Sequence, residues 1–364
     1  MPRLKRYNAT THEWEYVENS YIETDTLPSV GNYEFWEPSD VPTNFSCTPL
    51  GQSSQSIPAL SAIGYDGFLS TYFDTYLWQT YADGYTVTRE DLGLDSAASL
   101  TGNIEAPIYS YTFAPKRYRN TILLSAGMNP CEASTYFGLA MFVKALMEHT
   151  EQGMRDLYNT TRFVIIPILC PSGIYVSPFR YYNANGARIN KNFSYKGSWK
   201  YIHDNQTNQH EGSYPDSEVE TKILKNWVNR YPNSLLWIDC HSDTQGGATI
   251  IKHIGAEFCS DSWLTQRLIN DRPKVVNYYK AKGYISDSDT IHGSPSTSTS
   301  PEHPINYTYP KTTYAWEVLH THAMMIEQFC YSTAWGSDGD TNNDTYGIKH
   351  FCGLLRWACL AASR

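Results

Sequence analysis

Charged side chains are scarce in this sequence, and basic ones are scarcer than acidic ones. Only 18% of its 364 residues are charged, and 28 Lys and Arg stand against 37 Asp and Glu, which gives a formal net charge of −9. A protein that binds nucleic acid through its phosphates needs a basic face. The composition therefore predicts no nucleic-acid partner.

Long apolar runs are missing as well. No stretch approaches the roughly 20 residues of a membrane-spanning helix. The basic residues Arg3, Lys5 and Arg6 are not followed by the apolar segment of a secretory signal peptide. We therefore expect no membrane span and no signal peptide, with synthesis in the cytoplasm.

Cysteine pairs and low-complexity tracts are also lacking. The eight cysteines include no Cys-x-x-Cys pair, and several stand in apolar runs. This spacing is typical of small buried thiols in a reducing compartment, not of a disulfide scaffold. Hydrophobic residues make up 41% of the chain, which is enough for a sizeable core and excludes bulk disorder.

What is present divides the chain into two parts. Residues 1–57 contain scattered prolines and little helical period, with strand-like alternation near residues 5–8 and 13–17. This segment is too short to hold a core alone. We interpret it as an extended arm or small β element that docks on something else, followed by a main domain at 58–364.

The main domain alternates apolar strands with helical patterns. Continuous apolar runs at 121–126, 163–169 and 235–239 are typical of strands buried on both faces of a sheet. Helical patterns lie at 61–81, entered near Asp66, and at 133–149 and 217–231. The alternation predicts an α/β sandwich, in which ligands bind at the carboxyl ends of strands.

Four polar segments follow these strands or precede helices. They are residues 125–132, residues 171–193 with Pro171-Ser172-Gly173, Arg180 and Gly186-Ala187-Arg188-Ile189-Asn190-Lys191-Asn192-Phe193, residues 237–243 with Asp239-Cys240-His241-Ser242, and residues 313–318 with Glu317. Each is weak by itself, whereas their order and spacing together are specific.

This order resembles the zinc carboxypeptidases over roughly residues 58–360. Their pattern runs Gly-Met/Ile-His-Gly-Asn-Glu, Asn-Pro-Asp-Gly, an Arg, Gly-Val-Asp-Leu-Asn-Arg-Asn-Phe, Asp-x-His-Ser and a late strand with the catalytic Glu. The resemblance implies a three-layer α/β/α sandwich with a mixed, mostly parallel eight-stranded sheet. The opening of the chain is similar to that of phage and prophage tail proteins that carry this domain.

The resemblance also implies roles for individual residues. A catalytic zinc takes two His and one Glu and keeps a position for water, and a second Glu accepts the water proton. Carried over, Glu132 and His241 are metal ligands and Glu317 is the general base. Arg180 stabilises the transition state. Asn190 binds the substrate carboxylate, and Tyr307 (or Tyr309, by position only) closes over the substrate.

Three departures stand against these matches. Asn129 replaces the first-ligand His, and a neutral amide oxygen is a poor zinc ligand. Lys191 replaces the Arg that clamps the carboxylate, which keeps the charge but loses the planar fork. Arg188 replaces an Asp. If the protein binds a cofactor, we expect zinc. The alternative is that it binds no cofactor.

Other interpretations of the same residues stay open. Asn129 as N-cap, Pro130 at the first helical position and Glu132 three residues after the cap form a capping box for the helix at 133–149. Cys131 is a candidate replacement ligand. His241 is either a ligand or a strand-end His bonded to the backbone. Glu317, in an apolar strand, needs a cleft or a salt bridge with Arg180 or Lys191.

Two classes of function follow. The favoured one is a catalytically degenerate virion module, part of an oligomeric tail assembly, that binds other tail proteins through the arm or binds a host-surface peptide or glycan. The alternative is an active metallocarboxypeptidase that cleaves cell-wall peptides.

Overall fold

The computed structural model describes residues 3–8, 13–21, 58–99, 106–130, 132–172, 182–195, 203–204, 209–243, 254–258, 264, 310–329 and 341–363. Within the first 57 residues, β1 (Arg3–Asn8) and β2 (Glu13–Tyr21) pair as an antiparallel hairpin. Of the two forms expected for residues 1–57, an extended arm or a small β element, the described residues show a β element. Its docking role stays a prediction.

The main sheet of the described residues has seven strands in the order β10-β11-β9-β5-β6-β4-β3. Their bounds are β3 (Thr86–Leu94), β4 (Pro107–Ala114), β5 (Asn120–Ser125), β6 (Thr161–Ile166), β9 (Leu236–Asp243), β10 (Ile254–Phe258) and β11 (His322–Phe329). A separate two-residue ladder joins β7 (His203–Asp204) and β8 (Gln209–His210).

The sheet is mixed, as expected, with its parallel pairs in the middle. Strands β11, β9, β5 and β6 run parallel to one another, whereas β10 joins antiparallel at one side and β4 and β3 at the other. Parallel and antiparallel pairs are thus equally numerous, so the sheet is less parallel than the expectation stated. We expected eight strands in the main sheet, and the described part of the chain has seven.

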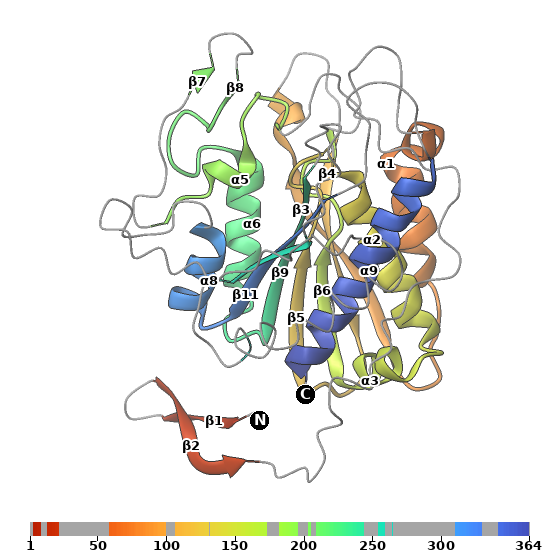
Figure 1. Cartoon of the computed structure of the whole chain (residues 1–364), viewed down its shortest axis with the longest axis vertical. Helices are drawn as coiled ribbons and strands as arrows, with labels where there is room; N and C mark the ends of the chain where they lie inside the picture. The colour runs from red at the N-terminus through yellow and green to blue at the C-terminus, as the bar shows by residue number, and fades with distance from the viewer. Residues whose placement is uncertain are drawn as a thin grey trace, which may run out of the picture.

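Helices cover both faces of this sheet (Figure 1). One layer holds α1 (Pro58–Tyr72), α2 (Ala133–Glu148), α3 (Gln152–Thr160) and α9 (Thr341–Ser363). The other holds α5 (Ile189–Asn192), α6 (Val219–Asn229) and α8 (Pro310–Leu319). Two short 3-10 turns, η2 (Asp74–Tyr76) and η3 (Ser96–Ser99), complete the described elements. The three-layer α/β/α prediction is confirmed.

The apolar strands feed two cores, one on each face of the sheet. Ile122 and Leu124 of β5 join the core beneath α2 and α9, while Leu123 between them joins the core beneath α6. β6 alternates in the same way. Side chains in a strand point alternately to opposite faces, so a run that is apolar throughout is buried on both. This confirms the interpretation of the apolar runs.

Two of the three predicted helices fit closely. α2 and α6 fall within the ranges expected at 133–149 and 217–231. The first helix begins at Pro58, well before the expected entry near Asp66. No helix in the described ranges combines the length and apolarity that crossing a membrane requires. The four cysteines described are free, buried thiols.

Candidate functional site

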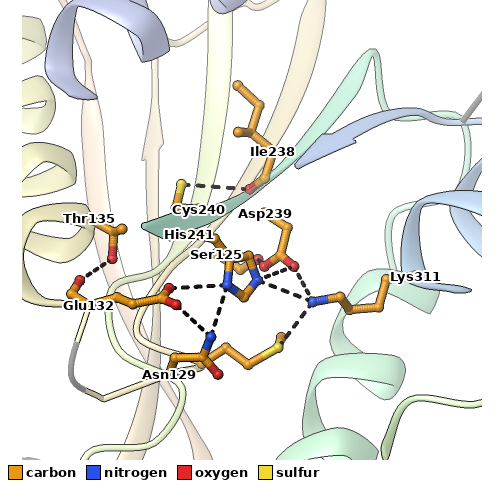
Figure 2. Close-up of polar contacts among 10 residues, drawn as sticks. Ser125, Asn129, Glu132, Thr135, Ile238, Asp239, Cys240, His241 and Lys311 are labelled. Atoms are coloured by element: carbon orange, nitrogen blue, oxygen red, sulfur yellow. Dashed lines mark hydrogen bonds and ion pairs between the residues drawn. The ribbon is translucent and has the colours of Figure 1, made fainter. Parts of the chain in front are cut away.

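A polar cluster lies at the carboxyl ends of the central strands. Ser125, the last residue of β5, pairs in register with Asp239 of β9. His241 follows two residues along β9 and so shares the face of Asp239. The loop between β5 and α2 carries Asn129 and Glu132 to the same place (Figure 2). The location predicted for ligand binding in an α/β sheet is therefore where these residues meet.

Gly127 makes the approach of this loop possible. It has a φ of +64°, and a Cβ on it would lie 2.8 Å from the Cα of Ile168. Only glycine tolerates both conditions. The chain can therefore turn tightly after β5, held by backbone hydrogen bonds from Leu169 N to Ala126 O and from Cys170 N to Gly127 O, both 3.0 Å.

The three positions predicted as metal ligands come together. Asn129 Nδ2 donates to Glu132 Oε1 at 2.6 Å and lies 3.3 Å from His241 Nδ1. His241 Nδ1 lies 3.1 Å from Glu132 Oε2. All three side chains are buried. The structure thus gathers residues more than a hundred positions apart in the chain around one point (Figure 2).

The other ring nitrogen of His241 faces Asp239. Nε2 lies 3.0 Å from Asp239 Oδ2. Burial by itself would lower the pKa of His241, but the carboxylates of Asp239 and Glu132 outweigh burial and raise the pKa to about 10. The imidazole is therefore protonated at neutral pH, and each ring N–H donates to a carboxylate.

Asp239 is the centre of the hydrogen bonding. Ser125 Oγ donates to its Oδ1 at 2.9 Å, and Trp237 Nε1 in turn donates to Ser125 Oγ at 3.0 Å. Burial would raise the pKa of Asp239, but the ammonium of Lys311 and the imidazole of His241 hold it well below its usual range. Asp239 is therefore an anion fixed by cations on the side that faces His241.

No motif in the sequence pointed to the contacts that Lys311 makes. It lies in the first turn of α8, and its side chain is 2% exposed. Its Nζ donates to Asp239 Oδ2 and lies 3.1 Å from Met128 Sδ and 3.4 Å from His241 Nε2. We call Ser125, Asn129, Glu132, Asp239, His241 and Lys311 the His241 cluster.

The comparison with known families agrees with this geometry. The family profile described as zinc carboxypeptidase matches residues 101–337, well over half of the chain. The chain belongs to the zinc carboxypeptidase family. The polar cluster lies inside the matched segment, so the residues at its ligand positions can be compared with the family's pattern one by one.

Solved carboxypeptidases share the fold. Carboxypeptidase A from Helicoverpa armigera is 15% identical with a TM-score of 0.57, over 85% of this chain and 74% of that one. Bovine thrombin-activatable fibrinolysis inhibitor, in complex with tick carboxypeptidase inhibitor, is 15% identical with a TM-score of 0.55, over 85% and 97%. A metallo-carboxypeptidase from Burkholderia cenocepacia is 15% identical with a TM-score of 0.51, over 80% and 67%. No curated protein sequence matches the chain.

The capping box expected at the start of α2 is wrong. The helix begins at Ala133 with Glu132 as its N-cap, and no side chain caps it. The Asn129 amide points to Glu132 and His241 instead of to a backbone N–H of the first turn. The tertiary contact with β9 therefore prevails over the local capping signal. Cys131, the candidate replacement ligand, lies outside the described residues.

The assignment of Glu317 to an apolar strand is also wrong. Glu317 lies on helix α8, and its side chain is exposed and accepts a hydrogen bond from Tyr195 Oη at 2.8 Å. It is six residues from Lys311, which places it roughly 9 Å further along the axis and on a different face. Because Lys311 faces the His241 cluster, Glu317 does not.

A late strand that does carry a glutamate is β11, with Glu327. In the parallel ladder of β9 and β11, Glu327 pairs in register with His241. Glu327 is therefore a better candidate than Glu317 for the glutamate that the family pattern predicts on a late strand. The run Met324-Met325-Ile326-Glu327, an acid within an apolar strand, was the signal that could have found it.

The predicted substrate-binding residues are only partly described. Asn190 and Lys191 lie on α5, both half-buried, and the buried Oδ1 of Asn190 has no hydrogen-bond partner among the described residues. Arg180 and Tyr307 fall outside the described ranges. The structure thus places the two residues of α5 and leaves the roles of all four as predictions.

The short helix α5 is held by a second polar cluster, of which the sequence motif at 186–193 contains only Asn192. Asn192 Nδ2 donates to Ser217 Oγ at 3.1 Å, and Glu218 N donates to Asn192 Oδ1 at 3.0 Å. Asn183 Nδ2 lies 2.7 Å from Glu218 Oε2 and 3.0 Å from Glu220 Oε2. We call Asn183, Asn185, Asn192, Glu218 and Glu220 the Asn183 cluster.

The donors at the ligand positions do not fit a catalytic zinc ion. Zinc needs three strong protein ligands, with imidazoles neutral. Here an amide stands at one position, and its Nδ2 donates to Glu132 and lies 3.3 Å from His241 Nδ1, so a hydrogen-bond donor occupies the point where the two ligands meet. Among the residues described, no group of three His, Cys, Asp or Glu side chains is arranged to hold a metal. No hydrolytic step through zinc is therefore derived for this chain.

Proposed function

We propose that this protein is a zinc carboxypeptidase-like module that has lost metal-dependent hydrolysis and is used as a structural or host-surface-binding component of a phage tail. The observation that carries the proposal is that the side chains of the His241 cluster contact one another directly. The Asn129 amide donates to Glu132 where the family places a His, so a hydrogen-bond donor takes the place of a metal-binding nitrogen beside this carboxylate.

The virion part of the proposal rests on the opening of the chain. Its resemblance to tail proteins that carry this domain supports a docking role for residues 1–57, and the β1–β2 hairpin gives that segment a defined element. The partners proposed are other tail proteins, through the arm, and a host cell-wall peptide or glycan. The arrangement proposed is an oligomeric assembly within the virion.

Metal content tests the loss of hydrolysis. The full chain, dialysed against trace zinc and then against buffer, should retain far less than stoichiometric zinc by mass spectrometry. It should not release the C-terminal residue from peptides or from cell-wall peptides. Stoichiometric zinc together with hydrolysis that a chelator abolishes would contradict the proposal.

An active metallocarboxypeptidase is the second candidate, and it is supported by the closeness of Glu132 to His241 and by the register of Glu327 with His241. Stoichiometric zinc together with hydrolysis that a chelator abolishes would establish this candidate.

Antibodies against the chain test the virion role of the protein. They should detect it in purified particles from its source, and the chain lacking residues 1–57 should fold but fail to enter particles. Normal incorporation of the truncated chain would contradict the docking role.

A further inference from the structure

The buried ammonium of Lys311 stands outside the motifs that the chain shares with the family. A buried ammonium is costly unless it is paired and hydrogen-bonded. Lys311 meets that condition through Asp239, and its Nζ also lies close to His241 Nε2 and Met128 Sδ. The buried Lys311 side chain extends from α8 to Asp239 on β9, so its ammonium is part of the site (Figure 2).

We propose that Lys311 supplies, inside the His241 cluster, the positive charge that a zinc ion would bring, and so holds the cluster together without metal. This inference rests on the proposed function. The cluster contains two buried carboxylates, Glu132 and Asp239. The Lys311 ammonium pairs with Asp239 and lies 3.4 Å from His241 Nε2, so a fixed cation already stands beside this predicted ligand.

Lys311 also opposes zinc binding through Asp239. A metal-binding His commonly donates its second N–H to a carboxylate, which makes the imidazole a better ligand, and loss of such a partner weakens metal binding. Asp239 occupies that place behind His241, but its Oδ2 is shared with the Lys311 ammonium. The lysine therefore weakens the hydrogen bond between Asp239 and His241 that would make the imidazole a better zinc ligand.

Zinc affinity tests this second effect directly. We compare Asn129→His with the double variant Asn129→His/Lys311→Met by calorimetric titration with zinc alone. Methionine keeps a long unbranched side chain beside Met128 and removes the charge. The double variant should bind zinc about tenfold more tightly or better. Equal affinity in the two proteins would overturn the proposal.

A matched control separates this effect from a general loss of positive charge. Lys225 pairs with Asp216 at 2.7 Å on the surface of α6. The variant Asn129→His/Lys225→Met should bind zinc as Asn129→His does. A gain as large as that from Lys311→Met would show that zinc affinity follows net charge and would also overturn the proposal.

Thermal stability tests the first effect in the metal-free chain. Lys311→Met alone should lower the Tm by about 5–10 °C, because Asp239 becomes a buried charge with one fewer cation. Adding Asp239→Asn to it should recover part of the loss. That second variant keeps the test informative if Lys311→Met does not fold. An unchanged Tm in Lys311→Met, or no recovery in the double variant, would overturn the structural role.

The outcomes distinguish this inference from the proposed function. If the natural chain binds no zinc but Asn129→His binds it equally well with Lys311 or Met, the loss of metal stands and the role of Lys311 fails. If the natural chain binds zinc stoichiometrically and cleaves peptides, the proposed function fails at the same time.

Discussion

The His241 cluster and the Asn183 cluster bury carboxylates at similar depth but satisfy them in opposite ways. In the first, Asp239 lies between the cations of Lys311 and His241, which hold its pKa well below the usual range against the effect of burial. In the second, burial raises the pKa of Glu220, and the hydrogen bonds from Ser96 and Asn183 offset this only in part.

The two clusters therefore differ in whether the partners of their buried carboxylates are charged or neutral. Neutral amide and hydroxyl donors compensate a buried carboxylate less completely than an ammonium or an imidazolium does. The Asn183 cluster positions a loop and a short helix, for which neutral donors are enough. The His241 cluster contains the residues that the resemblance predicts as metal ligands, and there Asp239 is paired with Lys311 and His241.

Removing the Asp239 carboxylate should have the largest effect. Asp239→Asn leaves the Lys311 ammonium buried without its anion, and we expect a loss of about 3–5 kcal/mol in the free energy of unfolding, measured by urea titration. The control Asp216→Asn removes an anion from a partly exposed pair with Lys225 and should cost at most about 1 kcal/mol. Similar losses in the two variants would contradict the comparison.

Removing Asn183 tests the neutral cluster and should cost less. Asn183→Ala takes donors from Glu218 and Glu220 and an acceptor from the backbone N–H groups of Asn185 and Ala187. We expect about 1–3 kcal/mol by the same titration. The exposed Asn159, changed to Ala, is the control, with a loss of at most about 0.5 kcal/mol. A loss exceeding that of Asp239→Asn would reverse the order.

The pH dependence of stability should also differ between the clusters. The pKa of Glu220 is raised above its ordinary value of 4.5 in the folded state. The folded protein then binds this proton more tightly than the unfolded chain, so stability falls as the pH rises from about 4.5 through the folded pKa.

Glu220→Gln should abolish that contribution, because the amide does not titrate. Its free energy of unfolding, measured relative to the natural chain by urea titration at each pH, should therefore rise with pH in this window. A difference that stays constant with pH would contradict the raised pKa.

The smallest effect is expected at Glu317. Because its side chain is exposed and its hydrogen bond with Tyr195 is exposed too, Glu317→Gln should change stability by about 0.5 kcal/mol or less. It should also leave zinc binding by Asn129→His unchanged. A change in zinc affinity would return Glu317 to the site.

The comparison of Glu317 with Glu327 shows how far the sequence reaches. Both glutamates follow short apolar stretches, and over four or five residues a buried helix and a buried strand have the same pattern. The family order required a Glu on a late strand, but only the pairing of β11 with β9 shows which Glu is opposite His241.

Asn129 shows the same limit in the opposite direction. Asn, Pro and Glu at that spacing satisfy a local capping signal. The helix nevertheless begins later, because the side chains of Asn129 and Glu132 contact His241 on β9 instead. A contact made across 112 positions is absent from any local pattern.

The α/β sandwich, the helices near α2 and α6 and the family could all be predicted from the sequence, whereas the ligand roles of Glu132 and His241 stay predictions. Apolar periodicity and motif order are written within a dozen residues, which is why they are readable. Only the tertiary structure shows that the ammonium of Lys311 pairs with Asp239. It meets Asp239 across 72 positions and Met128 across 183, and such charge pairing depends on which helix packs against which strand ends.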